Sequence, residues 1–321
     1  MAASIKRVSG QRRNLRRYYV HPHQNKERVF IEALQVAGYV PLQSLRAMHA
    51  VRFALLDHDV GALGNGHLRH LEEFHRRKIP VFMYPHAARP MVIWDGMYRL
   101  WPHTRCSFVI GEGHREVMER FGYPIPTEIV GWTLSEIKPF QPVERVHSIL
   151  FAPIHSGRLK CEMDVEINRQ AYKRLLDYCR QTGAQLTVRH IGDIEKSGIS
   201  MVSGVTYVRG RKDGSTRDIE RADLVVSHQT YAYMAVALGK PTLMMGEDVP
   251  PRSGDKYVAS WDLYKDIFMY PLDILSVSGK DIGRLIEIAA ECDRLIADWR
   301  DRMIGRAFDG PAFVKKLEKY L

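Results

Sequence analysis

A short polar loop follows one of the most apolar stretches of the chain. Four polar residues come directly after the run at 222–226: Ser227, His228, Gln229 and Thr230. A helical pattern then extends over 231–238 and ends at Gly239, a residue suited to the left-handed end of a helix. The unpaired N–H groups and the dipole at the start of such a helix favour an anion, so the loop is a candidate phosphate site. The alternative is an ordinary strand–loop–helix connection with a helix cap.

Cationic side chains follow other strand-like segments in this half of the chain. Arg158 comes after the apolar run at 148–151, and Arg189 ends the run at 185–189. Arginine makes strong charged hydrogen bonds to phosphate oxygens, so both residues are candidates for binding a phosphorylated ligand. Each could instead be a surface cation.

Acid–base side chains follow two strand-like segments of the first half. His58 and Asp59 come after the run at 51–57, and His86 comes after the run at 81–84. An enzyme that transfers a group to a hydroxyl needs a general base beside that hydroxyl. These three residues are our candidates for such a base. The alternative for Asp59 is a turn-capping role. The glycines that follow form no G-x-G-x-x-G pattern, which argues against a dinucleotide-dependent dehydrogenase.

Alternating strand-like and helix-like segments must position these side chains. Strands are predicted over 17–21, 51–57, 81–84, 107–110, 148–151, 185–189, 205–209, 224–226 and 241–245. Helices are predicted over 25–37, 68–77, 115–121, 165–182 and 231–238, with a mostly helical stretch over 281–321. This alternation is typical of parallel sheets covered on both faces.

The length of 321 residues favours two domains, and a proline-rich segment at 138–144 interrupts the periodicity. We therefore predict an α/β protein with two doubly wound, Rossmann-like domains, 1–140 and 146–321, the second carrying the terminal helices. Two such domains facing one another bring the carboxyl ends of their strands to a shared cleft, where open α/β sheets bind ligands.

The segment 222–241 resembles the nucleotide-diphosphate site of the two-domain GT-B glycosyltransferases. Three other segments resemble motifs of the CDP-glycerol glycerophosphotransferase and teichoic-acid polymerase branch: Tyr84–Ala87, Ile149–Ile154 and Val188–His190. The resemblance covers about residues 50 to 250 and extends more distantly to the UDP-N-acetylglucosamine 2-epimerases.

The resemblance implies catalytic roles for His86 and His190, and a diphosphate held by the loop from Ser227 to Thr230. It implies a metal-independent transferase with no cofactor, whose substrate is a nucleotide-diphosphate sugar or a CDP-glycerol-like donor. The chain departs from the family's pattern in three places. The His-Gly-Thr motif reads His-Ala-Ala from His86, Ile191 replaces a proline, and Met234 stands where many GT-B enzymes have an acidic ribose-binding residue.

A net charge of +10, from 47 Lys and Arg against 37 Asp and Glu, favours polyanionic partners. The first 17 residues concentrate this charge: Lys6, Arg7, Arg12, Arg13, Arg16 and Arg17. The acceptor is therefore expected to be either an envelope polymer or lipid-linked intermediate, with peripheral membrane contact, or hydroxymethylated DNA. The alternatives are a non-catalytic binding protein on a degenerate GT-B scaffold and a sugar-nucleotide epimerase.

No apolar run approaches the length of a membrane span, and the first residues lack a secretory signal, so a cytoplasmic location is expected. The four cysteines show no C-x-x-C spacing, which argues against a zinc site or a disulfide framework.

Overall fold

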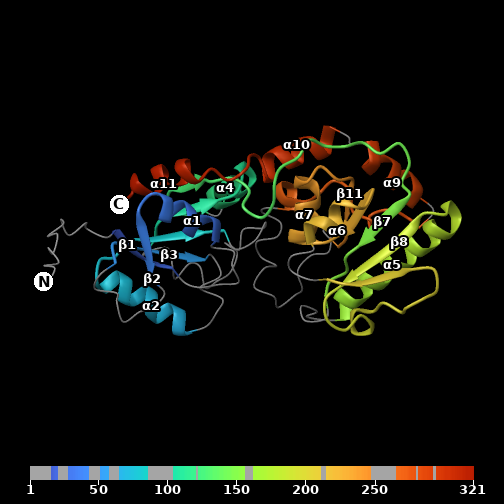
Figure 1. Ribbon diagram of the computed structural model, residues 1–321, viewed down its shortest axis with the longest axis horizontal. Helices are drawn as coiled ribbons and strands as arrows, with labels where there is room; N and C mark the ends of the chain where they lie inside the picture. Colours follow the sequence, from blue (N-terminus) through green and yellow to red (C-terminus); the bar gives the residue numbers. More distant parts are fainter. Residues whose placement is uncertain are drawn as a thin grey trace, which may run out of the picture.

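Two parallel β-sheets, each with its own helices, form the two halves of the computed structural model of this protein (Figure 1). The structure describes residues 16–20, 28–42, 51–57, 65–85, 104–120, 122–155, 162–210, 215–246, 265–279, 281–291 and 294–321, without the side chains of 57 and 65–70. The predicted α/β class with two doubly wound domains is confirmed. None of the helices in this part of the chain is long and apolar enough to cross a membrane.

The first sheet has six strands in the order β2-β1-β3-β4-β5-β6, all pairs parallel. They are β1 (Arg16–Val20), β2 (Tyr39–Leu42), β3 (Phe53–Asp57), β4 (Val81–Tyr84), β5 (Thr104–Val109) and β6 (Thr127–Ile129). The helices of this part are α1 (Arg28–Val36), α2 (Asn65–Arg76) and α4 (Glu112–Arg120). All four side chains of β4 are buried, as expected for a central strand covered on both faces. Arg16 and Arg17 of the predicted basic arm belong to β1, and the residues before them lie outside the described ranges.

The second sheet has five parallel strands in the order β11-β10-β7-β8-β9. They are β7 (Ser148–Phe151), β8 (Gln185–His190), β9 (Thr206–Arg209), β10 (Leu224–Ser227) and β11 (Thr242–Met244). The helices between them are α5 (Glu162–Thr182), the 3-10 turn η5 (Glu195–Ser197), α6 (Ser215–Glu220) and α7 (Gln229–Ala237). Because all strands run the same way, their carboxyl ends meet at one edge of the sheet.

Three helices end the chain: α9 (Ile282–Glu291), α10 (Arg294–Met303) and α11 (Gly310–Glu318). Figure 1 shows α11 beside α1, over the first sheet. The buried rings of Phe313 and Phe30 meet edge to face at 5.1 Å, and the Tyr39 hydroxyl donates to Glu318 at 2.9 Å. The assignment of all terminal helices to the second domain therefore needs correction, because α11 completes the core of the first.

The chain crosses between the domains twice, and the two crossings are hydrogen-bonded to each other. Trp132 donates its N–H to the carbonyl of Arg306 at 2.7 Å, and Phe308 donates to the carbonyl of Trp132 at 3.0 Å. Beside them α4 packs on α10, and the ring of His114 meets that of Phe268. Trp132, which follows β6, and the segment 306–308, between α10 and α11, are thus held together by a parallel backbone pairing.

The predicted linker packs against the end of α7. Lys138 and Gln141 donate their backbone N–H groups to the carbonyls of Ala237 and Gly239, at 2.8 and 3.0 Å. Gly239 has a φ of +73°, which confirms the predicted left-handed helix end. A Cβ at this position would lie 2.1 Å from the carbonyl oxygen of Pro139, so only glycine fits between helix and linker.

Replacing Gly131 by alanine is expected to destabilise the crossing. Its φ is +94°, and a Cβ would lie 2.6 Å from the carbonyl oxygen of Ala307, so the change adds a clash to the backbone strain. We expect a loss of about 2 kcal/mol in the free energy of unfolding, measured by urea denaturation. Gly122→Ala is the matched control, because Gly122 has a φ of +62° but open space around it, and should cost only about 1 kcal/mol. Equal losses in the two variants would contradict the packing argument.

Candidate functional site

The carboxyl ends of β8, β7 and β10 bring most of the described candidate residues of the second domain to one edge. Phe151 of β7 is in register with Val226 of β10 and Val188 of β8. One step further along the chain, Ala152 therefore lies between Ser227 and Arg189. The segments after β7, β9 and β11, at 156–161, 211–214 and 247–264, lie outside the described residues, and with them Arg158.

The side chain of Ser227 is fully buried and ties two strands together. Its hydroxyl donates to the carbonyl of Ala152 at 2.8 Å, and its own carbonyl accepts from the N–H of Met245 at 3.1 Å. The hydroxyl hydrogen is therefore used in a hydrogen bond that joins the ends of β10 and β7. Phosphate binding by Ser227 stays a prediction, and the structure gives the residue a role in positioning the strand ends.

The start of α7 combines a sharp turn with an exposed surface. His228 is extended, with φ −126° and ψ 156°, and its side chain makes no capping hydrogen bond to the helix. Gln229 has a φ of +45°, a left-handed conformation that costs a non-glycine residue about 1–2 kcal/mol. Gln229 is exposed and Thr230 is half-buried. Strain of this kind at the end of a buried strand is a feature of functional turns.

Asn168 of α5 anchors the chain where it leaves β7. Its side chain is fully buried and accepts from the N–H of Ile154 at 2.8 Å. Its amide group donates to the carbonyls of Ile154 and Ser197, each at 2.9 Å. Together with Ser227 it fixes residues 152–154 beside the start of α7. The sequence analysis missed Asn168, because a single asparagine within a long amphipathic helix gives no local signal.

Arg189 lies on the α6 and α7 side of the sheet, within a buried cluster. Its Nε donates to Asp218 at 2.9 Å and its Nη2 to the hydroxyl of Ser215 at 3.0 Å. The guanidinium also lies 5.0 Å from the centre of the Tyr231 ring, and only 4% of the residue is exposed. Arg189 was expected to face a donor, but the structure engages it with α6 and α7 instead. Direct donor binding by this residue stays untested.

His190 ends β8 and is half-buried at the same edge. Its Nδ1 lies 3.1 Å from the carbonyl oxygen of Gly192. A carbonyl can only accept, so Nδ1 carries a hydrogen and Nε2 is the nitrogen left for another partner. The catalytic candidates of the first domain, His58, Asp59 and His86, lie outside the described residues.

Met234, at the position where many GT-B enzymes carry an acid, is partly buried and packs on the hydrophobic core. Among the described residues, no three His, Cys, Asp or Glu side chains lie together as metal ligands. The predicted metal independence remains an expectation.

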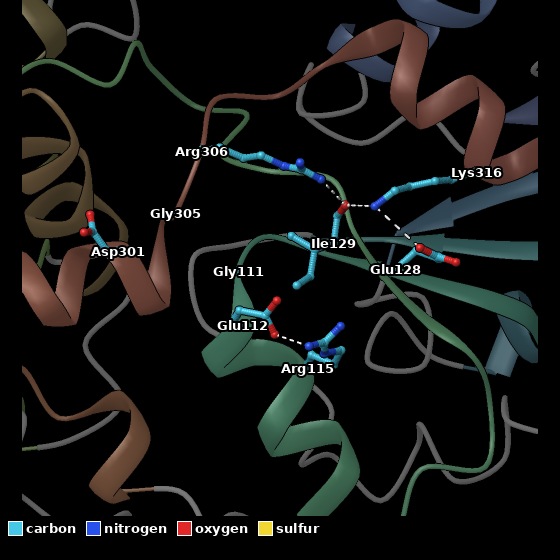
Figure 2. Close-up of a pocket in the computed structure, with 9 residues that line it drawn as sticks. All are labelled: Gly111, Glu112, Arg115, Glu128, Ile129, Asp301, Gly305, Arg306 and Lys316. Atoms are coloured by element: carbon cyan, nitrogen blue, oxygen red, sulfur yellow. Dashed lines mark hydrogen bonds and ion pairs between the residues drawn. The ribbon is translucent and has the colours of Figure 1, made fainter.

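A cavity of about 380 Å³ opens at the crossing between the domains, on residues that the sequence analysis did not single out (Figure 2). Gly111 and Glu112 at the start of α4, Glu128 and Ile129 of β6, and Lys316 of α11 lie around it. The remaining lining residues are Arg115, Asp301, Gly305 and Arg306.

The charges around this cavity already pair with one another. Glu112 pairs with Arg115, Glu128 with Lys316 at 3.5 Å, and the Lys316 and Arg306 side chains converge on the carbonyl of Ile129. No single segment contributes more than three of its residues, so local sequence patterns could not have revealed it.

The fold is that of the GT-B glycosyltransferases. Among solved structures, MurG of Acinetobacter baumannii is similar with a TM-score of 0.55 and 12% identity, over 95% of this chain and 99% of that one. The spinosyn rhamnosyltransferase SpnG complexed with thymidine diphosphate has a TM-score of 0.55 and 11% identity, over 95% and 100% of the two chains.

A putative UDP-N-acetylglucosamine 2-epimerase from Listeria monocytogenes has a TM-score of 0.57 and 9% identity, over 95% and 96%. No protein-family model and no curated protein sequence matches the chain. Identities this low establish the shared fold alone.

Proposed function

We propose that the protein is a transferase that moves a sugar, or a glycerol-phosphate-like group, from a nucleotide-diphosphate donor to a hydroxyl group. The observation that carries this proposal is the GT-B fold over 95% of the chain, shared with a glycosyltransferase whose structure holds thymidine diphosphate. Shared fold raises the expectation of shared chemistry, and the site must supply the rest of the argument.

The donor's diphosphate is assigned to the start of α7 in the second domain. The strained turn at Gln229 directs the chain from β10 into the helix, and the side chain of His228 makes no capping hydrogen bond to the first helical N–H groups. These groups and the helix dipole favour a phosphate there. Ser227 and Asn168 hold the neighbouring residues 152–154 in place, which supports a preorganised site.

The acceptor is assigned to the first domain, with His58, Asp59 or His86 as the general base. The transfer is proposed to need no metal, because charge on the leaving diphosphate can be stabilised by hydrogen bonds and dipoles alone. The net charge of +10 supports a polyanionic acceptor. An envelope polymer and hydroxymethylated DNA both fit. Phosphate contacts with DNA would make the affinity fall steeply with salt, whereas contact with a membrane would depend on its content of anionic lipid.

One observation favours a second candidate function. Met234 occupies the position of an acidic ribose-binding residue and contributes to the core instead, which fits a non-catalytic binding protein on this scaffold. The similarity to an epimerase structure keeps that activity as a third candidate. Slow hydrolysis of the donor without acceptor would distinguish a transferase from a binding protein, and an epimerase would convert the donor sugar alone.

The test is a thermal-shift screen of UDP, TDP, CDP, GDP and ADP. A ligand at about 100 times its Kd stabilises the native state by about 2.7 kcal/mol, so at least one nucleotide is expected to raise the Tm by about 5 °C. Cooperative melting without a shift for any nucleotide would overturn the proposal.

Two variants at Thr230 test whether the nucleotide binds at the start of α7. Thr230→Glu puts a carboxylate in the first turn of α7, which suits the helix dipole but repels a phosphate. We expect it to melt at or above the Tm of the unmodified protein and to lose the nucleotide shift. Thr230→Gln has a similar size without the charge and should keep most of the shift. If the two variants respond alike, the diphosphate does not lie at α7.

A further inference from the structure

Cationic side chains gather at the amino edge of the first sheet, where its strands begin. Arg17 of β1 and Arg52, just before β3, are neighbours, and the N–H of Arg52 donates to the carbonyl of Arg17 at 2.7 Å. The register of Ala54 with Val81, followed back along both strands, brings Lys78 within one residue of the level of Arg52. Because neighbouring strands lie about 4.8 Å apart, these three residues span about 10 Å. We refer to Arg17, Arg52 and Lys78 as the basic edge.

None of the carboxylates in the described ranges pairs with the basic edge. Arg52 and Lys78 are exposed, and Arg17 is half-buried. The exposed Arg120 of α4, by contrast, pairs with Asp266 at 2.8 Å. Cations whose charge is not compensated within the chain attract polyanions.

The positive charge extends beyond these three residues. Arg76 and Arg77, where α2 ends, share one carboxylate, that of Glu73. Glu72 is the other acid of this stretch. On the other side, the chain enters β1 after a segment rich in cations: Lys6, Arg7, Arg12 and Arg13. Cations therefore outnumber acids in the segments that lead into the basic edge.

Lys78 occupies a backbone position that suits glycine. Its φ is +55°, in the left-handed region, two residues after the end of α2. Its N–H donates to the carbonyl of His75, and the N–H of the next residue donates to the carbonyl of Phe74, both at 2.8 Å. Helices that end in this way favour glycine at the left-handed position, because any other side chain is strained there. A strained lysine at an exposed, uncompensated site points to a use for its charge.

The basic edge suits a row of phosphates. Its span of about 10 Å corresponds to about three successive phosphates of one DNA strand, at about 3.4 Å of rise each. Two of its three cations are guanidinium groups, which can bind two phosphate oxygens at once. A membrane surface would be bound by apolar side chains as well as by cations. Among the exposed large apolar side chains of the described residues, only Val36 belongs to a helix that ends at this edge.

We propose that the basic edge is a docking surface for the phosphate backbone of duplex DNA. It lies at the opposite edge of the sheet from the strand ends to which the acceptor hydroxyl is assigned, because all strands of this sheet are parallel. The surface therefore holds the polymer away from the site of transfer. It contacts phosphates and does not read bases. The proposal goes beyond the proposed transfer reaction and does not depend on which group is transferred.

The test measures binding of a fluorescently labelled DNA duplex by anisotropy at several salt concentrations, without any nucleotide. We expect the logarithm of the binding constant to fall with the logarithm of the salt concentration, with a slope of at least about 3 in magnitude. Arg52→Gln/Lys78→Gln should weaken binding about tenfold and lower the magnitude of this slope by about 2. Lys173→Gln/Arg221→Gln is the matched control, because it removes the same charge from exposed positions of the second domain and should leave the Kd unchanged.

Lys78→Gly separates a binding role from a structural one. Glycine relieves the backbone strain, so the variant should melt about 2 °C higher while binding DNA about threefold more weakly. DNA binding that is equal in the two double variants, or absent from the unmodified protein, would overturn the docking surface. So would vesicles rich in phosphatidylserine that bind through the same residues when DNA does not. The nucleotide thermal shift should be the same in Arg52→Gln/Lys78→Gln as in the unmodified protein, so the proposed function is decided separately.

Discussion

Replacing Asn168 by alanine is expected to lower the free energy of unfolding by about 3–5 kcal/mol. The variant leaves the N–H and carbonyl of Ile154 and the carbonyl of Ser197 buried without the partner they have now. Each unsatisfied buried group costs about 1–3 kcal/mol, partly relieved by local relaxation. Urea denaturation monitored by far-UV circular dichroism would measure the loss, and a change below about 1 kcal/mol would contradict it.

Asn168→Asp is the matched variant, because it has the same shape but a different hydrogen-bonding pattern. Its carboxyl can still accept from Ile154, but in the ionised form it faces the two carbonyls to which the amide donated. The carboxyl should therefore have a raised pKa in the folded state. A group with a raised folded pKa contributes stability below that pKa and loses it as the pH rises. The variant is thus expected to be closer to the unmodified protein at about pH 5 than at about pH 7.

Asn168 and Ser227 together form a clamp on residues 152–154, and this clamp has a functional consequence. Asn168 and Ser227 fix the three residues between β7 and the segment that follows it. If the diphosphate lies at the start of α7, a loosened clamp should weaken nucleotide binding even where the protein remains folded. A thermal shift that shrinks in Asn168→Asp more at about pH 7 than at about pH 5 would connect the clamp to the site.

Central strands could be predicted from the sequence because burial on both faces gives them continuous apolar runs. The segments 81–84 and 148–151 were predicted with the bounds that β4 and β7 have. Edge elements were missed for the opposite reason. β2 is short and contains Pro41, which argues against a strand, and β6 has only three half-buried residues. Such strands are specified by their neighbours in the sheet.

The place of α11 could not be predicted from its own pattern. Its apolar stripe, with Phe313 and Leu317, shows that one face is buried but not against which partner. The partner is α1, which begins 282 residues earlier, at Arg28 against Gly310, and Trp132 pairs with the segment around Ala307 just before α11. Long-range pairing of this kind leaves no local signal.

In the candidate site, too, the features with a local sequence pattern were predicted and those set by distant contacts were not. The polar loop at 227–230 was recognised because a strand, a short polar segment and a helix follow one another along the chain. The orientation of its side chains was not, because Ser227 faces a backbone carbonyl of another strand. Arg189 was expected to be a donor ligand from its position at a strand end, although its partner Asp218 lies 29 residues further on. The position of a residue along a strand predicts at which edge of the sheet it lies. Its hydrogen-bond partners, which come from other segments, decide what the side chain does there.

Replacing Arg189 by methionine is expected to lower the free energy of unfolding by about 2–4 kcal/mol. Methionine has a similar length, so the loss reflects the charge and the hydrogen bonds to Asp218 and Ser215. Removing one partner of a buried pair leaves the other charge uncompensated, but Asp218 is 24% exposed, and water will relieve part of that cost. Arg189→Lys keeps the charge without the planar fork and should lose about half as much.

A double-mutant cycle with Asp218→Asn separates the ion pair from simple packing. If the pair is the cause, Asp218→Asn should recover about 1–2 kcal/mol in the background of Arg189→Met, because the uncompensated carboxylate is gone. Unchanged stability on adding the second substitution would show that the loss comes from packing against Tyr231 and Gly210. The cluster joins the ends of β8 and β9 to α6 and α7. Nucleotide binding should therefore fall together with stability in Arg189→Met, and a variant that unfolds more easily yet keeps the full thermal shift would separate this cluster from the proposed donor site.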